Sequence, residues 1–139
     1  MALNEQIYDQ IQSLCTQGDS LADDGCYEQA LALYQQALEK IPQPLYDYEA
    51  SVWIYAAIGD ALFFMEQFEQ ALEAFMQARK CYGGLESAFV LLRIGECYYE
   101  LEQYDLSREA LIGTYMLEGE EIFESEDEKY LMAIADLIA

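Results

Sequence analysis

Apolar side chains recur along most of the chain at the three- and four-residue intervals of an amphipathic helix. No segment alternates between apolar and polar residues for long enough to indicate a β-strand. Breaks in the helical pattern divide the chain into seven predicted helices. These helices are expected at residues 4–23, 26–40, 47–64, 68–81, 86–100, 104–118 and 126–138. The pattern therefore predicts an all-α protein.

Two of the breaks contain residues that end helices. Pro42 and Pro44 each lack a backbone N–H and restrict the residue before them, so the helix that precedes them must stop. Gly83 and Gly84 follow the fourth predicted helix, and a glycine there can adopt the left-handed conformation that closes a helix. We therefore expect longer connections at these two places.

One spacing of small and large residues occurs three times. Gly18, Gly59 and Gly95 are each followed 12 residues later by a small residue, and 16 residues later by a large one. The small residues are Ala30, Ala71 and Ser107, the large ones are Tyr34, Phe75 and Leu111, and Ala37, Ala78 and Thr114 follow three positions further on. The small residues allow two helices to approach closely, and the large residues fill the space between them. We therefore expect these residues to form the core and not a site.

This spacing resembles the tetratricopeptide repeat (TPR), a helix–turn–helix unit of about 34 residues. The resemblance implies a single domain over 1–139, a right-handed superhelix of three helix pairs followed by a C-terminal capping helix. The repeats are expected at approximately 11–44, 52–85 and 88–121, and the capping helix at approximately 125–138. TPR arrays usually bind proteins and carry no chemistry of their own, so the resemblance predicts a protein-binding module.

The last predicted helix has the features of a cap. Ser125 and Glu128 form a Ser-x-x-Glu capping box, which satisfies free backbone amides at a helix start. An apolar stripe follows, made of Tyr130, Leu131, Ala133, Ile134, Leu137 and Ile138. A stacked array needs such a helix to cover its last hydrophobic face. The alternative is a helix that forms a dimer or docks a partner.

The charge of the chain limits its partners. There are 27 acidic residues against six basic ones, which gives a formal net charge of −21. Repulsion disfavours direct binding to nucleic acid or to an anionic membrane, and the same field accelerates encounter with a basic protein. The alternative is that the acidity only keeps the protein soluble.

Catalytic chemistry has little support in the sequence. The chain has no histidine, no C-x-x-C pair among its four cysteines and no Gly-rich phosphate loop. We therefore predict no enzyme activity, no cofactor and no metal site. No apolar stretch is long enough to span a membrane and the first residues lack a signal-peptide pattern, which predicts a cytoplasmic location.

The TPR resemblance also implies which residues face the concave surface. Counting from Gly18, Gly59 and Gly95 as position 8 of each repeat, the concave positions carry acids and aromatic rings. These predicted partner-binding residues are Asp19, Asp23, Trp53, Asp60, Phe63, Phe64, Phe89, Glu96, Tyr99 and Glu100. Some of the rings, above all Phe63 and Phe64, have packing between repeats as an alternative role. An aromatic patch edged by acids is typical of a protein-binding surface.

One known TPR activity does not fit these positions. TPR proteins that grip the C-terminal carboxylate of heat-shock chaperones use lysine, asparagine and arginine at five concave positions. Here those positions hold Cys15, Asp19, Ala57, Phe89 and Arg93. Only Arg93 matches, so the sequence favours a groove for cations and apolar side chains.

A second resemblance concerns the last third of the chain. The stretch Gly113–Glu124 and the sequence Glu128-Lys129-Tyr130, with the small size and acidity, are similar to the small acidic TPR proteins found beside bacterial polymorphic toxins. This resemblance implies an immunity protein that binds and neutralises a toxin. The alternatives are a secretion chaperone, similar to the TPR chaperones of type III systems, and a general adaptor.

Overall fold

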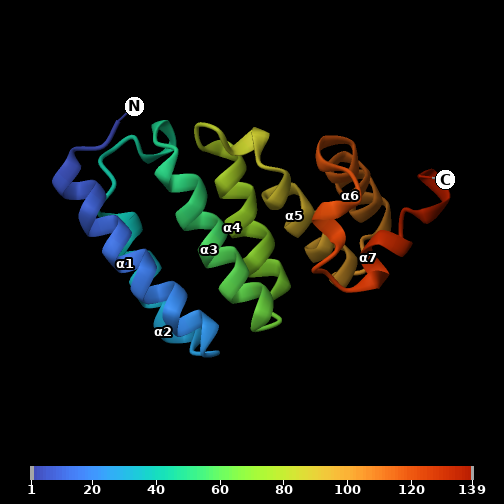
Figure 1. The fold of residues 1–139 in the computed structure, drawn as a ribbon, viewed down its shortest axis with the longest axis horizontal. Helices are drawn as coiled ribbons and strands as arrows, with labels where there is room; N and C mark the ends of the chain where they lie inside the picture. Colours follow the sequence, from blue (N-terminus) through green and yellow to red (C-terminus); the bar gives the residue numbers. More distant parts are fainter. Residues whose placement is uncertain (1, 139) are drawn as a thin grey trace.

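The computed structural model describes residues 2–138, and within them it contains helices and no β-strands. Six long α-helices form three consecutive pairs, shown in Figure 1. The helices are α1 (Glu5–Asp23), α2 (Tyr27–Glu39), α3 (Ala50–Phe64), α4 (Phe68–Lys80), α5 (Ala88–Glu100) and α6 (Tyr104–Glu118). The predicted all-α architecture of three TPR-like pairs is confirmed, and the six long helices end within a few residues of their predicted bounds.

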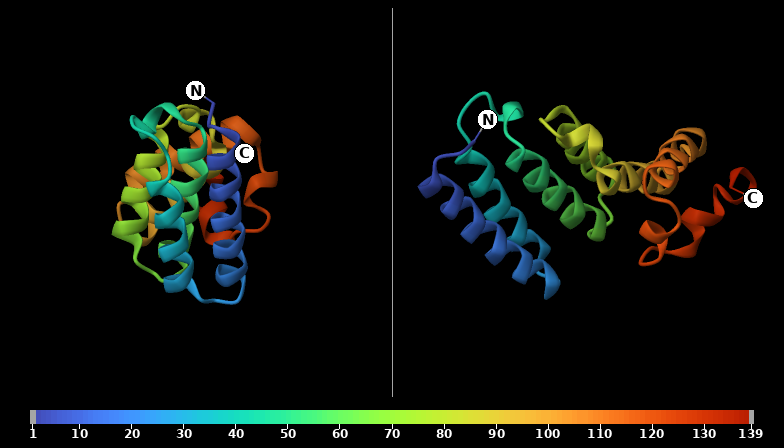
Figure 2. Two further views of the ribbon diagram at one scale, coloured as in Figure 1. Left: turned by 90° about the vertical axis from the view of Figure 1, so that its left-hand side faces the viewer. Right: turned by 45° about the horizontal axis from the view of Figure 1, so that its top comes forward.

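The two helices of each pair lie side by side, and the pairs are stacked in chain order (Figure 1). Figure 2 shows the same stack from two other directions. The turn inside each pair contains one residue with positive φ at the equivalent position, namely Gly25 at 81°, Glu66 at 61° and Glu102 at 61°. A left-handed residue reverses the chain within a short connection. The three pairs are therefore repeats of one structural unit.

Close helix contact inside each pair depends on the repeated glycines. A Cβ atom placed on Gly18 would lie 2.6 Å from the ring of Tyr34, and one on Gly59 would lie 2.6 Å from the ring of Phe75. A Cβ on Gly95 would meet Leu111 at 2.7 Å in the same way. These distances are shorter than van der Waals contact, so only glycine permits the observed approach. The packing role predicted for the glycines is confirmed.

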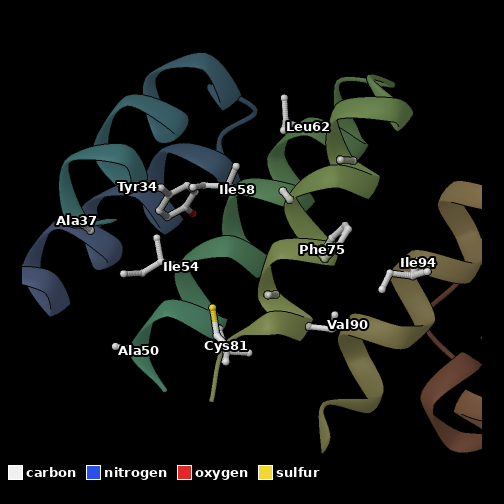
Figure 3. Close-up of a cluster of buried hydrophobic side chains, with 14 of the residues drawn as sticks. Tyr34, Ala37, Ala50, Ile54, Ile58, Leu62, Phe75, Cys81, Val90 and Ile94 are labelled. Carbon is white, nitrogen blue, oxygen red and sulfur yellow. The ribbon is translucent and has the colours of Figure 1, made fainter. Parts of the chain in front are cut away.

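The core continues from one pair to the next. Figure 3 shows Tyr34, Ile54 and Ile58 between the first two pairs, and Phe75, Val90 and Ile94 towards the third. All six side chains are buried. Burial of aliphatic and aromatic side chains at each interface stabilises the stack, because each pair has an apolar face that it cannot cover alone.

The connections between pairs are longer than in an average repeat and contain short 3₁₀ helices. The first connection contains η1 (Leu45–Asp47), and the second contains η2 (Gly84–Glu86). Gly83 has φ of 86°, so the left-handed conformation predicted after the fourth helix is present. None of the helices in residues 2–138 combines the length and the apolar character needed to cross a membrane.

The chain after α6 differs from the predicted single capping helix. It folds as η3 (Glu121–Phe123), α7 (Glu128–Met132) and η4 (Ala135–Leu137), which lie against the third pair in Figure 1. The prediction of a capping box at Ser125 is wrong. The N-cap residue is Asp127, whose side chain accepts a hydrogen bond from the backbone N–H of Lys129 at 3.0 Å. We call residues Glu120 to Ile138 the C-terminal segment.

A second, smaller apolar cluster holds the C-terminal segment in place. Phe123, Tyr130 and Ile134 from the segment are buried against Leu92 of α5 and Leu111 of α6. The predicted apolar stripe is therefore used in part to cover the third pair, while Leu137 at its end stays exposed. The segment covers the last hydrophobic face of the stack, as expected of a cap.

Candidate functional site

A groove with a volume of about 790 Å³ lies between the first two pairs and the start of α5. Its walls come from α1, α2, α3 and α5, because successive pairs are offset and their first helices face one side. The lining residues are Asp19, Ala22, Asp23, Tyr27, Tyr34, Trp53, Ala56, Ala57, Asp60, Ala61, Phe64 and Phe89.

The groove carries negative charge and no positive charge. Asp19, Asp23 and Asp60 line it, whereas no lysine or arginine is among its lining residues. Asp19 accepts a hydrogen bond of 2.6 Å from the hydroxyl of Tyr34, and burial together with this bond raises the pKa of Tyr34. The hydroxyl therefore remains a donor that orients one aspartate. The groove is suited to cationic groups.

Aromatic rings form the other part of the lining. Trp53, Phe64 and Phe89 keep 39%, 51% and 36% of their surface exposed. The ring of Tyr27 is stacked near that of Phe64, with centroids 6.0 Å apart, and Tyr8 contacts Trp53 edge to face at 6.2 Å. Half-exposed rings held by other rings present large apolar surface with little loss of side-chain entropy on binding.

An arginine surrounded by carboxylates lies next to the groove, in contact with its lining residues Asp60, Phe64 and Phe89. The Arg93 Nε atom lies 2.7 Å from Asp60 Oδ1, and its Nη1 atom lies 2.7 Å from Glu96 Oε1. The same Nη1 atom also pairs with Glu126 of the C-terminal segment. We call these four residues the Arg93 cluster. Three phenylalanine rings surround the guanidinium, with centroids 4.9 to 5.5 Å away, from Phe63, Phe64 and Phe89.

The Arg93 cluster contains three acidic side chains and one arginine, and Glu96 is the acid whose pKa is raised most. Glu96 is fully buried, and its Oε2 atom has no hydrogen-bond partner among the described residues. Burial and the neighbouring Glu126 carboxylate raise the pKa of Glu96 to about 9, although Arg93 opposes this shift. Burial also raises the pKa of Asp60, against the effect of Arg93. Glu96 is therefore protonated at neutral pH.

This protonation makes stability depend on pH. The pKa of Glu96 is raised from 4.5 to about 9, so the folded chain holds a proton that the unfolded chain releases within this range. The free energy of unfolding should fall as pH rises from about 4.5 to 9, by at most about 1.4 kcal/mol per unit. The glutamine side chain of the Glu96→Gln variant cannot ionise, so we expect the free energy of unfolding of this variant to depend less on pH. Its stability relative to the wild type should therefore increase as pH rises.

Urea unfolding at pH 6, 7.5 and 9 measures this difference. The control is Glu109→Gln, which makes the same change at an exposed position of α6 and should follow the wild type. Parallel wild-type and Glu96→Gln profiles would contradict the protonated state of Glu96.

The C-terminal segment covers the third-pair part of the same face. The hydroxyl of Tyr130 donates a 2.6 Å hydrogen bond to Glu100 Oε2, and the Lys129 ammonium lies 2.8 Å from the same oxygen. The ring of Tyr130 contacts that of Tyr99 edge to face at 5.4 Å. Tyr99 and Glu100 are therefore occupied by the chain's own side chains.

The ten residues predicted for the concave face fall into four groups. Asp19, Asp23, Trp53, Asp60, Phe64 and Phe89 line the groove. Phe63 packs edge to face on Phe68 and Phe64 and faces Arg93. Tyr99 and Glu100 lie under the C-terminal segment. The expectation that Glu96 is an exposed carboxylate is wrong, because the Arg93 cluster buries it completely.

The partner-binding residues predicted from the sequence do not include Tyr27, Arg93 or Glu126. Tyr27 begins the second helix of its pair, whereas the predicted concave positions all lie on first helices. Glu126 lies 33 residues from Arg93, so no local pattern joins them. A signal was available for Arg93, because it is a cation three residues before Glu96 among acidic concave positions. Arg93 is the one residue that matches the positions used to grip a chaperone tail, and here it is paired with Asp60, Glu96 and Glu126 instead.

The stacked helix pairs and the groove define a helical-repeat scaffold of the protein-binding class. The sequence model of the tetratricopeptide repeat matches residues 9–83, which is more than half of the chain. This protein belongs to the tetratricopeptide repeat family. The match covers the first two repeats, and the structure supplies the third in α5 and α6.

Solved TPR structures have the same fold at low sequence identity. The type III secretion chaperone SycD of Yersinia enterocolitica, solved with a peptide of the translocator YopD, superposes with a TM-score of 0.75 at 15% identity, covering 96% of both chains. The first TPR of Spaghetti (RPAP3), bound to an HSP90 peptide, gives 0.73 at 16% identity, covering 91% of this chain and 97% of that one. The Sgt2 TPR domain of Aspergillus fumigatus gives 0.69 at 18% identity, covering 91% and 75%. No curated protein matches the sequence.

Proposed function

We propose that this protein binds one basic protein partner in the groove and neutralises it, as a toxin-immunity protein does. The observation that carries the proposal is the composition of the groove, which combines exposed rings with Asp19, Asp23 and Asp60, of which only Asp60 is paired with an arginine, Arg93. A partner segment with lysine or arginine beside a large apolar residue complements this surface. The net charge of −21 would steer such a partner towards the groove.

The Arg93 cluster supports the choice of a cationic ligand. Phe64 and Phe89 both line the groove and surround the Arg93 guanidinium, and Asp60 pairs with it. These contacts show that aspartate and phenylalanine at this face hold a guanidinium by charge and by cation–π contact. Asp19 and Asp23 make no ion pair among the described residues, so the partner's cation would pair with them. An acidic chaperone tail such as the HSP90 peptide SRMEEVD, bound by the similar Spaghetti domain, would find aspartates and no lysine or arginine among the lining residues of this groove.

A secretion chaperone is the second candidate. The open groove across α1, α3 and α5 has room for an extended segment, and SycD, a chaperone similar along nearly the whole chain, binds a translocator peptide. The two roles differ in the form of the partner. A neutralising protein holds one folded partner in an equimolar complex and abolishes its activity, whereas a chaperone retains exported proteins through unfolded stretches.

The test is affinity capture from the native host with three matched baits. The wild-type chain should retain a basic protein, and Asp23→Lys, which reverses a charge in the groove, should weaken its binding at least tenfold. Trp53→Ala removes the largest exposed ring of the groove and should cost about 2 kcal/mol or more of binding free energy, mainly through faster dissociation. Titration of the purified pair in increasing salt measures both effects.

The control bait is Glu109→Lys, which makes an equal charge reversal on α6, away from the groove, and should bind like the wild type. A partner that the wild type and both charge-reversal variants retain equally would bind elsewhere, and an acidic partner would overturn the proposal. Mixing stoichiometry and an activity assay of the captured partner then distinguish the neutralising role from the chaperone role.

A further inference from the structure

The C-terminal segment meets the third pair with the chemistry proposed for a partner. Lys129 pairs with Glu100 at 2.8 Å, and its ammonium lies 5.7 Å from the ring centroid of Tyr99 and 5.3 Å from that of Tyr130. Tyr99 and Glu100 belong to the concave positions of α5. A cation with a neighbouring ring thus occupies an acidic and aromatic surface within one chain.

This covered surface is continuous with the groove. Phe89 lines the groove and contacts the Arg93 guanidinium, and Arg93 in turn pairs with Glu126 of the segment. The Arg93 cluster therefore joins the open part of the face, over the first two pairs, to the covered part over the third. A partner that extends along α1 and α3 arrives at the edge of the C-terminal segment.

The segment is attached in a way that permits local opening. Its helical parts are short, with five residues in α7 and three each in η3 and η4. Three of its links are ion pairs, made by Glu126 with Arg93, by Lys129 with Glu100 and by Asp136 with Arg108. Two hydrogen bonds, from Tyr130 to Glu100 and from Arg108 to the carbonyl of Ala133, and the small apolar cluster around Phe123, Tyr130 and Ile134 complete the attachment. Short elements with few apolar contacts open at a lower free energy than the long helices.

We propose that the protein-binding surface continues beneath the C-terminal segment, and that Lys129 and Tyr130 hold the place of a basic residue and an adjacent ring of the partner. This inference rests on the proposed function, because it extends the same face by one repeat. The partner displaces the segment when it binds across all three pairs. The free chain then has a shortened groove, and the partner competes with an intramolecular ligand.

A peptide from the chain itself tests the covered surface. The probe is a fluorescein-labelled peptide of residues Glu128–Ile138 with blocked ends, measured by anisotropy at 150 mM NaCl. In the full-length Lys129→Glu/Tyr130→Ala variant, the segment loses the ion pair and the hydrogen bond to Glu100 and the ring contact with Tyr99. The peptide should bind this variant at least tenfold more tightly than the wild type, in which the segment competes. A full-length Lys40→Glu chain has the same charge change and should behave as the wild type.

Hydrogen exchange of the unmodified chain gives a second readout that needs no variant. The amides of Ala133 and Ile134 should exchange at least tenfold faster than that of the buried Ile94 of α5. A peptide that binds neither chain, or segment amides as slow as α5, would overturn the inference. The groove variant Asp23→Lys should leave peptide binding unchanged, so a failure of the groove proposal is distinguished from a failure of this one.

Discussion

Replacement of Arg93 by methionine should lower the free energy of unfolding by about 3 kcal/mol or more. Methionine keeps much of the apolar contact with Phe63, Phe64 and Phe89 but removes the charge. Asp60, Glu96 and Glu126 then face one another with no cation, in a site where Glu96 is fully buried and the Glu126 side chain is 13% exposed. Carboxylates left without a partner in such a site destabilise the fold far more than a lost surface pair. Urea unfolding followed by circular dichroism measures the difference.

Arg108→Met provides the matched control. Arg108 donates two hydrogen bonds to Asp136 and one to the carbonyl of Ala133, but the side chains of Arg108 and Asp136 are largely exposed, with 37% and 64% of their surface accessible. Exposed ion pairs contribute little, so this variant should stay close to the wild type. Adding Glu126→Gln to Arg93→Met should restore part of the loss, because one unpaired charge disappears. Equal stability of Arg93→Met and Arg108→Met would mean that water solvates the carboxylates of Asp60 and Glu126.

The repeats could be predicted from the sequence because their packing depends on residues at fixed local spacing. Gly18, Gly59 and Gly95 meet the large side chain found 16 residues later, inside one helix pair. The spacing therefore reports a physical contact directly. The predicted groove residues on α1 and α3 follow from the same geometry, since position within a repeat decides which side of a helix is exposed.

The end of the chain could not be predicted in this way. Its local signal, the capping box at Ser125, favoured a helix from about residue 125, but Glu126 is engaged by Arg93 and α7 begins after Asp127. At the other end of α7, the carbonyl of Ala133 accepts a hydrogen bond from Arg108. Both contacts join residues that lie 25 or more positions apart. The burial of Glu96 and the covering of Glu100 follow from these distant contacts.

Replacement of Gly84 by alanine should destabilise the chain by about 3 kcal/mol, at the upper end of what overpacking costs. Gly84 lies in the connection between the second and third pairs, where a Cβ atom would stand 2.0 Å from the carbonyl oxygen of Ala78 and 2.9 Å from the Cα of Arg79. Both atoms are backbone, so no side-chain rotation can relieve the clash. The end of α4 or the η2 turn must move, and α5 begins only four residues later.

Gly113→Ala makes the same substitution with the opposite expectation. Gly113 lies inside α6, and its added Cβ would meet only the flexible end of Leu91 at 3.1 Å. Alanine is about 1 kcal/mol more favourable than glycine within a helix, so this variant should be neutral or more stable. The two midpoints of urea unfolding, compared with the wild type, measure the effect. If Gly84→Ala unfolds at the wild-type midpoint, the connection is free to shift, and the third pair is not held in register with the groove by this contact. If it unfolds at a lower urea concentration, the close backbone contact at Gly84 holds the connection in place, and this connection leads directly into α5, which carries Phe89 to the groove.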